Sequence, residues 1–375
     1  MVETQTAVVG AGIIGMATAL ELARTGRVVH VVERAPSPGA EASGAAAGML
    51  APQHEADGPS PFLELCLEAR DLWLEVARDL LSTTGIDPGH HTDGLLHLAL
   101  DASEWAALQR RSTWQSGVGL PVEELLPAEI RRRFPAVTQE IPGALFYYGD
   151  HYINTTHSLE AYYAACRAAD VHFIFGREVT ALRTEPDSGA VRVAAVQTDG
   201  LEIAAETTLL AAGAWTGQIT ESIGYRLPVE PVRGQAVLTT MKDDPPEYIL
   251  SCTDGYIVPR EGGEIFIGAT SERVGFDRST TEEGVQSVWK AAQWILPSLK
   301  ECRPSQSWAG LRPGSPDDLP IIGPAPGVRD LWLATGHYRN GLLLGPLTGL
   351  LLSRWITTGE PGRDMTPFLP DRFIG

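Results

Sequence analysis

Three glycines near the N-terminus, Gly10, Gly12 and Gly15, have the spacing G-x-G-x-x-G, and Glu33 follows the last of them by eighteen residues. In such a motif the first glycine allows a tight turn, the second lets a pyrophosphate approach the backbone, and the third lets a helix pack closely on a strand. An acidic side chain at this distance accepts hydrogen bonds from ribose hydroxyls, and its charge repels a 2′-phosphate. The spacing therefore predicts a site for a dinucleotide without a 2′-phosphate.

The residues around this motif predict the order strand, turn, helix and strand. The apolar run 7–9 ends a buried strand, the apolar residues of 13–25 repeat with helical spacing, and 28–32 is rich in β-branched residues. The helix would present free amide groups and the positive end of its dipole to the phosphates. A lone glycine pattern also occurs in ordinary strand-to-helix turns. The flanking strands and the acid are therefore what favour dinucleotide binding.

Two later stretches consist mainly of small residues. Residues 43–49 follow the second strand and contain only Gly, Ala, Ser and Met, and 207–216 is typical of a strand that ends in a small-residue turn at Gly213. Small residues allow a backbone to pass close to a flat ligand. We therefore expect both stretches to contact the cofactor.

Composition limits the classes of partner. With 375 residues the chain exceeds the usual size of one domain, so two domains are expected. A net charge of −18 argues against nucleic acid and anionic membranes as partners. The four cysteines are far apart and form no C-x-x-C pair, so we expect no metal site and no disulfide framework. We expect a cytoplasmic location, because no basic leader precedes the glycine motif and the apolar stretch 341–356 is too short to cross a membrane. We also expect a homo-oligomer.

Seven motifs occur in the same order as in a known family. They are the glycine motif with Glu33, SGAAAGML (43–50), LLAAGAWTG (209–217), YIVPR (256–260), FIGAT (266–270), WAGLRPG (308–314) and GHYRNGLLLGP (336–346). From about residue 6 to 356 the sequence resembles glycine oxidases of the thiamine pathway, which belong to the D-amino acid oxidase-like flavoproteins. The resemblance implies an FAD enzyme that oxidises glycine and other small amines to imines, with oxygen as acceptor and hydrogen peroxide as product.

The resemblance also implies a fold. It would be α/β (α+β overall) and D-amino acid oxidase-like, with a Rossmann-type FAD-binding domain around a central parallel sheet and a substrate-binding domain around an antiparallel sheet. Alternating patterns in 229–240 and 249–270 favour strands of the second sheet. The FAD-binding domain would be discontinuous, and the two domains would comprise 1–85, 143–217 and 306–375 for FAD, and 86–142 and 218–305 for substrate.

The roles that the resemblance implies fall into four groups. The pyrophosphate turn and adenosine end would use Gly10, Gly12, Ile13, Ile14, Gly15, Glu33, Arg34 and Val179. The flavin would be lined by Ala42, Ser43, Ala47, Gly48, Met49 and Gly213. The late motif would wrap the flavin ring through His337, Tyr338, Arg339, Asn340, Gly341, Leu342 and Leu343. The substrate would be held by Met49, Tyr256, Arg312 and Arg339, of which the last three would form the catalytic site.

The expected chemistry suits these residue types. A guanidinium such as that of Arg312 can hold a carboxylate with two parallel hydrogen bonds, and the Tyr256 hydroxyl can add a third. No acid–base residue is required if the amine binds neutral, although Asp254 is a weak candidate for a base. Without the resemblance Arg312 would be interpreted as a surface arginine in a Pro-Gly turn, Tyr256 as a core residue and Arg339 as a residue at a helix start.

Two positions depart from the family. Asp254 stands where some relatives have a histidine, and Ser271 stands where a methionine can occur, so the substrate range is open. The segment 309–311 lacks the cysteine that attaches flavin in sarcosine oxidase-like relatives, so we expect non-covalent FAD.

Several alternatives remain at this point. The protein could be another D-amino acid or sarcosine oxidase or dehydrogenase of the same family. It could be an NAD-dependent dehydrogenase, which shares the N-terminal fingerprint, or a flavin-binding assembly or sensor protein without turnover. The late cofactor segments LLAAG and GHYRNG favour FAD over NAD.

Overall fold

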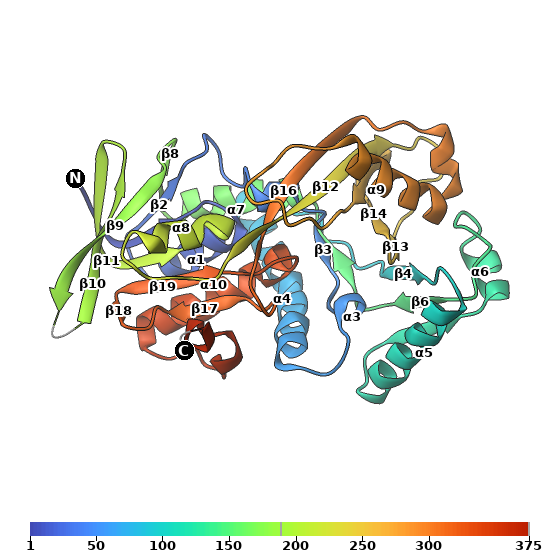
Figure 1. Ribbon diagram of the computed structural model, residues 1–375, viewed down its shortest axis with the longest axis horizontal. Helices are drawn as coiled ribbons and strands as arrows, with labels where there is room; N and C mark the ends of the chain where they lie inside the picture. Colours follow the sequence, from blue (N-terminus) through green and yellow to red (C-terminus); the bar gives the residue numbers. More distant parts are fainter. Residues whose placement is uncertain (188–189, 374–375) are drawn as a thin grey trace.

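The computed structural model describes residues 1–187 and 190–373. Residues 188–189 and 374–375, which fall in the segments expected for the FAD-binding domain, lie outside the described residues. Two large sheets lie at opposite ends of the elongated molecule, with the chain crossing between them several times (Figure 1). The predicted α/β fold with two sheets is confirmed.

The first sheet is parallel at its centre, as the sequence predicts. Its main path runs in the order β17 (Ile321–Pro324), β19 (Leu331–Thr335), β11 (Leu201–Leu210), β1 (Val2–Val9), β2 (Val29–Glu33) and β8 (His172–Phe175). β9 (Val179–Asp187), β10 (Ala190–Thr198) and β18 (Val328–Arg329) branch from this path. A hairpin at Asp199-Gly200 joins β10 to β11, and the strand expected within 207–216 begins earlier, at Leu201.

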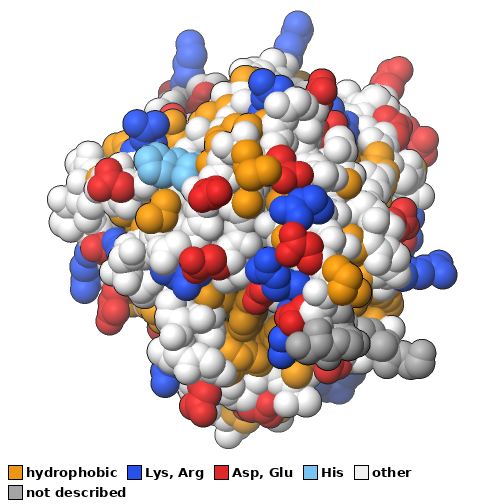
Figure 2. All heavy atoms as spheres, turned by 90° about the vertical axis from the view of Figure 1, so that its left-hand side faces the viewer, with side chains coloured by type: hydrophobic (Ala, Val, Ile, Leu, Met, Phe, Trp, Pro, Cys, Tyr) orange, Lys and Arg blue, Asp and Glu red, His pale blue; other side chains and the backbone are white. Residues whose placement is uncertain are grey.

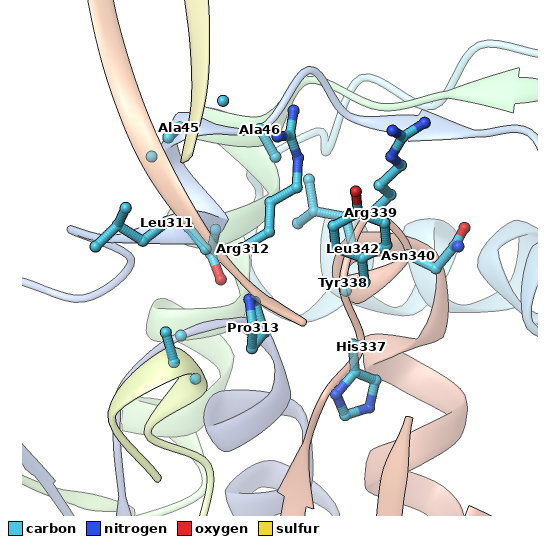
Figure 3. A pocket seen from close by; sticks show the side chains of 18 of the residues that line it. Ala45, Ala46, Leu311, Arg312, Pro313, His337, Tyr338, Arg339, Asn340 and Leu342 are labelled. Atoms are coloured by element: carbon cyan, nitrogen blue, oxygen red, sulfur yellow. The ribbon is translucent and has the colours of Figure 1, made fainter. Parts of the chain in front are cut away.

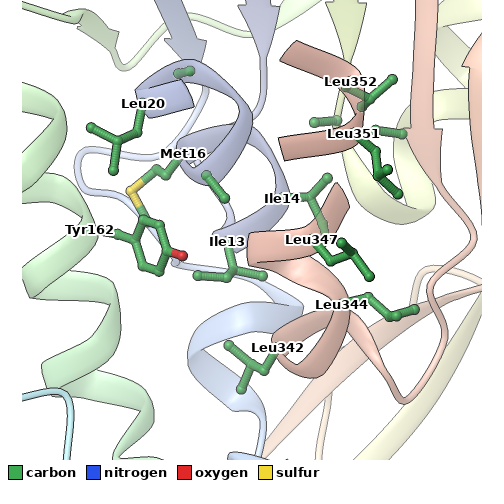
Figure 4. Close-up of a cluster of buried hydrophobic side chains, with 14 of the residues drawn as sticks. Ile13, Ile14, Met16, Leu20, Tyr162, Leu342, Leu344, Leu347, Leu351 and Leu352 are labelled. Atoms are coloured by element: carbon green, nitrogen blue, oxygen red, sulfur yellow. The ribbon is translucent and has the colours of Figure 1, made fainter. Parts of the chain in front are cut away.

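Four long helices pack together against this sheet. They are α1 (Ile13–Arg24), α4 (Pro61–Thr84), α7 (Thr155–Ala168) and α10 (Gly341–Thr358). α1 and α10 approach closely because α10 presents glycines to α1. A Cβ at Gly345 would lie 2.7 Å from the Ile13 side chain, and one at Gly349 would lie 2.7 Å from the Ala17 backbone. The C-terminal helix is thus part of the same buried core as the glycine turn (Figure 4).

The second sheet carries the antiparallel strands. Its order is β16 (Gln306–Gly314), β12 (Glu230–Thr240), β15 (Glu264–Gly268), β14 (Gly255–Pro259), β13 (Ile249–Cys252), β4 (Leu95–Leu98), β6 (Ala144–Tyr147) and β5 (Val122–Leu125). One neighbouring pair, β13 and β4, is parallel, because the two strands come from separate parts of the chain that no hairpin connects. The helices of this half are α5 (Ala102–Gly117), α6 (Pro127–Arg133) and α9 (Glu282–Ile295).

The sheet membership places two strands differently from the expected domain segments. β6 and β16 pair within the second sheet, although 143–147 and 306–314 were assigned to the FAD-binding domain. β16 pairs along its whole length with β12, which holds it in the substrate half. We therefore propose that these two domain boundaries lie after β6 and after β16.

The remaining elements are short. They are α2 (Ala42–Ala45), β3 (Met49–Leu50), α3 (Pro52–Glu55), β7 (His151–Tyr152), α8 (Thr216–Glu221) and 3-10 turns at Gly213–Trp215, Glu261–Gly263, Pro297–Glu301, Thr366–Phe368 and Pro370–Phe373. β3 pairs with β7, so the small-residue segment after β2 is fixed to the chain that leaves β6.

The end of the molecule formed by the first sheet carries charges of both signs (Figure 2). There Arg183 lies 2.5 Å from Glu185 and 3.3 Å from Glu202, and Arg192 lies 3.2 Å from Glu185. The acidic excess of the chain therefore does not gather in one patch on this face. Over 1–187 and 190–373 no helix has the length and apolar content that a membrane span requires.

Candidate active site

A single cavity of about 1330 Å³ runs between the two sheets. One end lies at the carboxyl ends of β1 and β2, where the glycine turn begins, and the other lies beneath β12, β14 and β16. Cavities for drug-sized ligands span roughly 300–1,000 Å³. The volume therefore suits a dinucleotide together with a small substrate.

The glycine turn is shaped by backbone contacts. Gly10 has φ +105°, and a Cβ there would lie 2.5 Å from the Ala211 carbonyl oxygen. A Cβ at Gly15 would lie 1.9 Å from the Gly10 carbonyl oxygen. At Gly12 the nearest protein atom to such a Cβ is Ser43 Oγ at 3.1 Å. Gly10 and Gly15 are therefore required by the fold itself, whereas Gly12 leaves open space that a phosphate group can use.

Glu33 ends β2 beside this turn. Its Oε2 accepts a hydrogen bond from the Ala11 amide at 2.8 Å, and its Oε1 accepts one from the Ala35 amide at 2.9 Å. Each carboxylate oxygen retains a further lone pair for a ribose hydroxyl. Nearby, the Arg34 guanidinium lies 3.7 Å above the Trp215 ring. The Glu33 carboxylate therefore stabilises the turn and also offers acceptor sites to a ligand in the cavity.

The segment that follows β2 forms the middle of the wall. Residues 42–45 form the short helix α2, and the Ser43 hydroxyl accepts a hydrogen bond from the Ile13 amide at 3.1 Å. β16 passes directly over α2, since a Cβ at Gly310 would lie 2.5 Å from the Ala45 Cβ. The glycine of the WAGLRPG motif therefore permits close contact between the two halves.

Two arginines extend into the other end of the cavity. Arg312 comes from β16 and Arg339 from the loop before α10, and Figure 3 shows both side chains pointing toward the same side. Arg312 Nη1 donates to the Thr270 carbonyl oxygen at 3.0 Å, and its guanidinium lies against Gly234 of β12, where a Cβ would be 2.2 Å from Nη1. The guanidinium also interacts with the Tyr256 hydroxyl, and its remaining donors are available to an anion.

Tyr256 of β14 shares this space. Its ring is stacked on Phe266 with an interplanar angle of 4°. Burial raises the pKa of the Tyr256 hydroxyl, while Arg312 and Arg339 act in the opposite direction. The hydroxyl is therefore a neutral donor at physiological pH, placed among two cations.

Glu55 at the end of α3 was not among the predicted site residues. Its Oε2 accepts a hydrogen bond from Asn340 Nδ2 at 3.0 Å, and its charge interacts with Arg339 and Arg312. Desolvation by the surrounding cavity walls raises the pKa of the Glu55 carboxyl, against the opposing effect of these groups, although the side chain is accessible from the cavity. The sequence indicated Glu55 only as a charged residue six positions after Met49, and this pattern is too common to identify a site residue.

A polar cluster of two histidines and a serine was also missed. His54 Nε2 lies 3.2 Å from His97 Nδ1, and Ser251 Oγ lies 2.8 Å from His97 Nδ1 and 3.3 Å from His54 Nε2. Burial lowers the pKa of His97 to about 3 and that of His54 well below its usual value. Both rings are therefore neutral at pH 7 and act as hydrogen-bonding groups of the cavity wall.

The two positions that depart from the family lie at the substrate end. Ser271 Oγ lies 3.1 Å from the Tyr338 hydroxyl, so a polar contact replaces the apolar side chain of some relatives. Asp254 lines the cavity and is exposed. Tyr338 itself has φ +47°, which places its ring beside the Arg339 guanidinium at 5.1 Å.

Most of the predicted residues line this one cavity. The residues that do so are Gly10, Gly12, Ile13, Ile14, Glu33, Arg34, Ala42, Ser43, Ala47, Gly48, Met49, Val179, Gly213, Tyr256, Arg312, His337, Tyr338, Arg339, Asn340, Gly341 and Leu342. Gly15 and Leu343 do not line it. Gly15 faces the Gly10 carbonyl, and Leu343 is turned by one helical step into the buried core against α1.

The donor set fits FAD. The first amide groups of α1 have no partner within the helix, and the open side of Gly12 gives a phosphate access to them. The wall at 42–49 consists of small residues that let a flat ring approach. In the described parts of the chain no group of three or more His, Cys, Asp and Glu side chains could hold a metal ion.

Known proteins match nearly the whole chain. A family model described as FAD dependent oxidoreductase (DAO) matches residues 5–355. The glycine oxidase of Pseudomonas aeruginosa is 37% identical over 370 residues, which cover 97% of each chain, and the hydrogen cyanide synthase subunit HcnC of that organism is 31% identical over 98% of this chain and 95% of its own length. The crystal structure of glycine oxidase from Geobacillus kaustophilus superposes over 100% of both chains with a TM-score of 0.94 and 35% identity. The chain therefore belongs to the DAO family of FAD-dependent oxidoreductases.

Proposed function

We propose that the protein is a glycine oxidase that holds FAD non-covalently and converts glycine, O2 and water to glyoxylate, ammonia and hydrogen peroxide. Sarcosine and small D-amino acids are further candidate substrates. The observation that carries the proposal is the pair of cavity arginines, Arg312 and Arg339, beside the Tyr256 hydroxyl at one end of a dinucleotide-sized cavity. Full-length similarity to glycine oxidases supports it.

Substrate binding follows from the charges at this end. The free donors of the Arg312 guanidinium can take both oxygens of a carboxylate, and the Tyr256 hydroxyl can donate to the same group. A carboxylate held at two points leaves the α-carbon with little freedom. Such positioning matters because a displacement of about 1 Å can cost a hundredfold in rate.

The amino group needs to bind as the neutral amine for oxidation at the α-carbon. The Glu55 carboxylate interacts by charge with both Arg339 and Arg312. It can therefore orient the amino group of the substrate and accept a proton from it. FAD, when bound, supplies the acceptor for the hydride that leaves the α-carbon. Asp254 lines the cavity too, but its charge is not among those that act on Glu55, Tyr256 or Arg339, so we assign no base role to it.

Purified protein tests this proposal. We expect yellow protein whose visible band bleaches on anaerobic addition of glycine, with peroxide released in air. Comparing peroxide formation from glycine, sarcosine, D-alanine and D-proline ranks the substrates. Yellow protein that no amine bleaches would support the sensor alternative, and colourless protein that reduces NAD would support a dehydrogenase.

The similarity to a hydrogen cyanide synthase subunit favours a second candidate function. Cyanide formation from glycine requires further oxidation of the first imine product, whereas a glycine oxidase releases that imine for hydrolysis. Product analysis distinguishes the two: glyoxylate and ammonia support the oxidase, and cyanide supports the alternative.

We further propose a role in thiamine biosynthesis, a cytoplasmic location and a homo-oligomeric state. Growth of a deletion strain without thiamine tests the first, cell fractionation tests the second, and light scattering tests the third.

A further inference from the structure

Four consecutive carbonyl groups behind the cavity wall are each bound by a donor from one of three distant parts of the chain, 153–155, Arg260 and Trp308. The acceptor and donor pairs are Ala45 O with Trp308 Nε1 at 3.2 Å, Ala46 O with Thr155 Oγ1 at 3.0 Å, Ala47 O with Arg260 Nη2 at 2.5 Å, and Gly48 O with Ile153 N at 2.9 Å. A run of carbonyls held in this way fixes the orientation of the peptide planes between them.

The amide groups of the same segment remain available. Across the described residues the amides of Ala47 and Gly48 donate no hydrogen bond. Ala47, Gly48 and Met49 line the cavity, whereas Arg260 does not. The carbonyls are thus directed to the scaffold by groups behind the wall, and the two free amides can serve a ligand in the cavity.

Arg260 is the one charged donor in this set. Its guanidinium also donates to the Ile153 carbonyl oxygen at 2.9 Å and to Thr155 Oγ1 at 3.3 Å, and it lies 5.7 Å from the centre of the Phe266 ring. No carboxylate of the described chain forms an ion pair with it. Burial lowers the pKa of Arg260 to about 10, so the group is still charged at pH 7.

A largely desolvated arginine whose charge is offset by Glu264 without an ion pair carries a cost that backbone bonds alone do not explain. Arg260 lies at the end of β14, in the substrate half, and its acceptors belong to the segment that joins β2 to β3 and to the start of α7. A neutral donor could hold one of these carbonyls, but the fork of a guanidinium holds two segments at once.

We propose that Arg260 is a positioning residue for the flavin: through the Ala47 carbonyl it holds the peptide group that carries the Gly48 amide, with that amide toward the ring, and it places a positive charge behind this peptide group. The inference rests on FAD being bound along this wall. Because reduction makes the bound cofactor more negative, a buried cation behind the wall favours the reduced state and raises the midpoint potential.

Three variants distinguish the effect of the Arg260 hydrogen bonds from the effect of its positive charge. Arg260→Gln removes the charge and the fork, and Arg260→Lys keeps the charge without the fork. Thr155→Val removes the neutral hydrogen bond to the Ala46 carbonyl and the 3.3 Å acceptor of Arg260, but it leaves the charge and the Ala47 contact of Arg260 in place. The measurements are the FAD dissociation constant of the apoprotein, the midpoint potential of the bound flavin, and thermal unfolding with and without FAD.

We expect Arg260→Gln to raise the FAD dissociation constant about ten- to a hundredfold, as for other residues that orient a primary ligand, and to make the midpoint potential more negative. Arg260→Lys should keep a potential near that of the wild type with an intermediate FAD affinity. Thr155→Val should weaken FAD less than Arg260→Gln and leave the potential unchanged.

Two outcomes overturn the inference. One is unchanged FAD affinity and potential in Arg260→Gln. The other is equal thermal destabilisation of apoprotein and holoprotein with an unchanged potential, which would show that Arg260 only holds the two halves together. If Arg260→Gln does not fold, the FAD affinity and the midpoint potential of Arg260→Lys test the inference instead. Wild-type protein that binds FAD but is not bleached by glycine would contradict the proposed substrate and leave these measurements valid.

Discussion

The two ends of the cavity are built in different ways. At the glycine end the groups that face the ligand are backbone atoms of one continuous stretch, β1, the turn and α1, closed by Glu33 of the next strand. At the arginine end the ligand would meet four side chains, and these come from α3, β14, β16 and the loop before α10: Glu55, Tyr256, Arg312 and Arg339.

This difference predicts different sensitivities. A backbone cradle is limited by space, so an added methyl group has no room and the fold or the cofactor is lost. A cluster of side chains on a rigid scaffold can lose or shift one member while the scaffold persists. Changes at the glycine end should therefore affect folding and FAD, whereas changes at the arginine end should affect turnover.

The largest expected effect is at Gly15. A Cβ there would lie 1.9 Å from the Gly10 carbonyl oxygen, which is backbone and cannot move aside. We expect Gly15→Ala to lower the free energy of unfolding by more than about 4 kcal/mol, measured by denaturant titration. Gly58→Ala is the matched control, because a Cβ at Gly58 meets no atom within 4 Å. A Gly15→Ala protein as stable as this control would show that the turn is not close-packed.

Gly12→Val should separate cofactor from fold. Since only the Ser43 hydroxyl lies near a Cβ at this position, at 3.1 Å, we expect folded but colourless protein. Absorbance near 450 nm relative to 280 nm, together with circular dichroism, measures this. Glu33→Ala should weaken FAD less, because it removes hydrogen bonds without adding a clash. Full flavin content in Gly12→Val would place the phosphates elsewhere.

Arg312→Ala should affect turnover and leave the scaffold intact. Losing one partner of a desolvated charge pair costs about 2–5 kcal/mol, which corresponds to a loss in kcat/KM for glycine of roughly thirtyfold to several thousandfold. Arg312→Lys should recover part of it, because an ammonium lacks the fork. FAD content and thermal stability should change little. If Arg312→Ala slows glycine and an amine without a carboxylate equally, Arg312 is not the carboxylate anchor, and Arg339 becomes the first candidate.

Gly234→Ala tests the position of the same arginine without removing it. A Cβ at Gly234 would lie 2.2 Å from Arg312 Nη1 and 2.4 Å from its Cζ, and a flexible side chain can move away from it. We expect a folded, yellow protein in which kcat/KM for glycine falls by up to about a hundredfold. Steady-state kinetics with glycine and with a neutral amine measure the effect. Unchanged kinetics with glycine would mean that the guanidinium can bind the carboxylate from more than one position.

The smallest expected effect is on the pH dependence of stability, and it involves one histidine at each end of the cavity. Burial lowers the pKa of His97, at the substrate end, and of His337, near the cofactor, to about 3. Because each folded pKa lies below the unfolded value near 6.5, stability from these groups is present above pH 6.5 and is lost as pH falls. Asp150 has the opposite sign: its pKa is raised by burial to about 7, so its neutral form favours the folded state at low pH and that contribution is lost as pH rises toward 7.

Removing one histidine should therefore flatten the pH dependence. We expect His97→Gln and His337→Gln each to reduce the slope of unfolding free energy between pH 6 and 4 by up to about 1.4 kcal/mol per pH unit. Denaturant titrations at several pH values provide the measurement, and the wild-type contribution of Asp150 cancels in the difference. An unchanged slope would mean that the histidine takes up its proton in the folded state.

Much of the architecture could be predicted, because it repeats at short range. The glycine turn, the parallel strands beside it and the helix expected over 13–25 appear in the structure close to their predicted places. In contrast, β5 and α6 were not predicted, since the segment 118–142 is polar and rich in proline and has no clear period. Leu343 was placed on the cavity wall because the motif that contains it is contiguous, although a helix turns each residue away from the last.

The sequence by itself determined the dinucleotide end, where glycines at fixed spacing dictate the backbone path whatever surrounds them. It also supplied Arg312, Tyr256 and Arg339 through motifs that resemble a known family. Only the tertiary structure decided that these three share one cavity with Glu55, and that Arg260 reaches the peptide groups behind Ala47. The physical reason is range: a turn depends on neighbours along the chain, whereas a side-chain cluster depends on how two sheets from distant segments pack against each other.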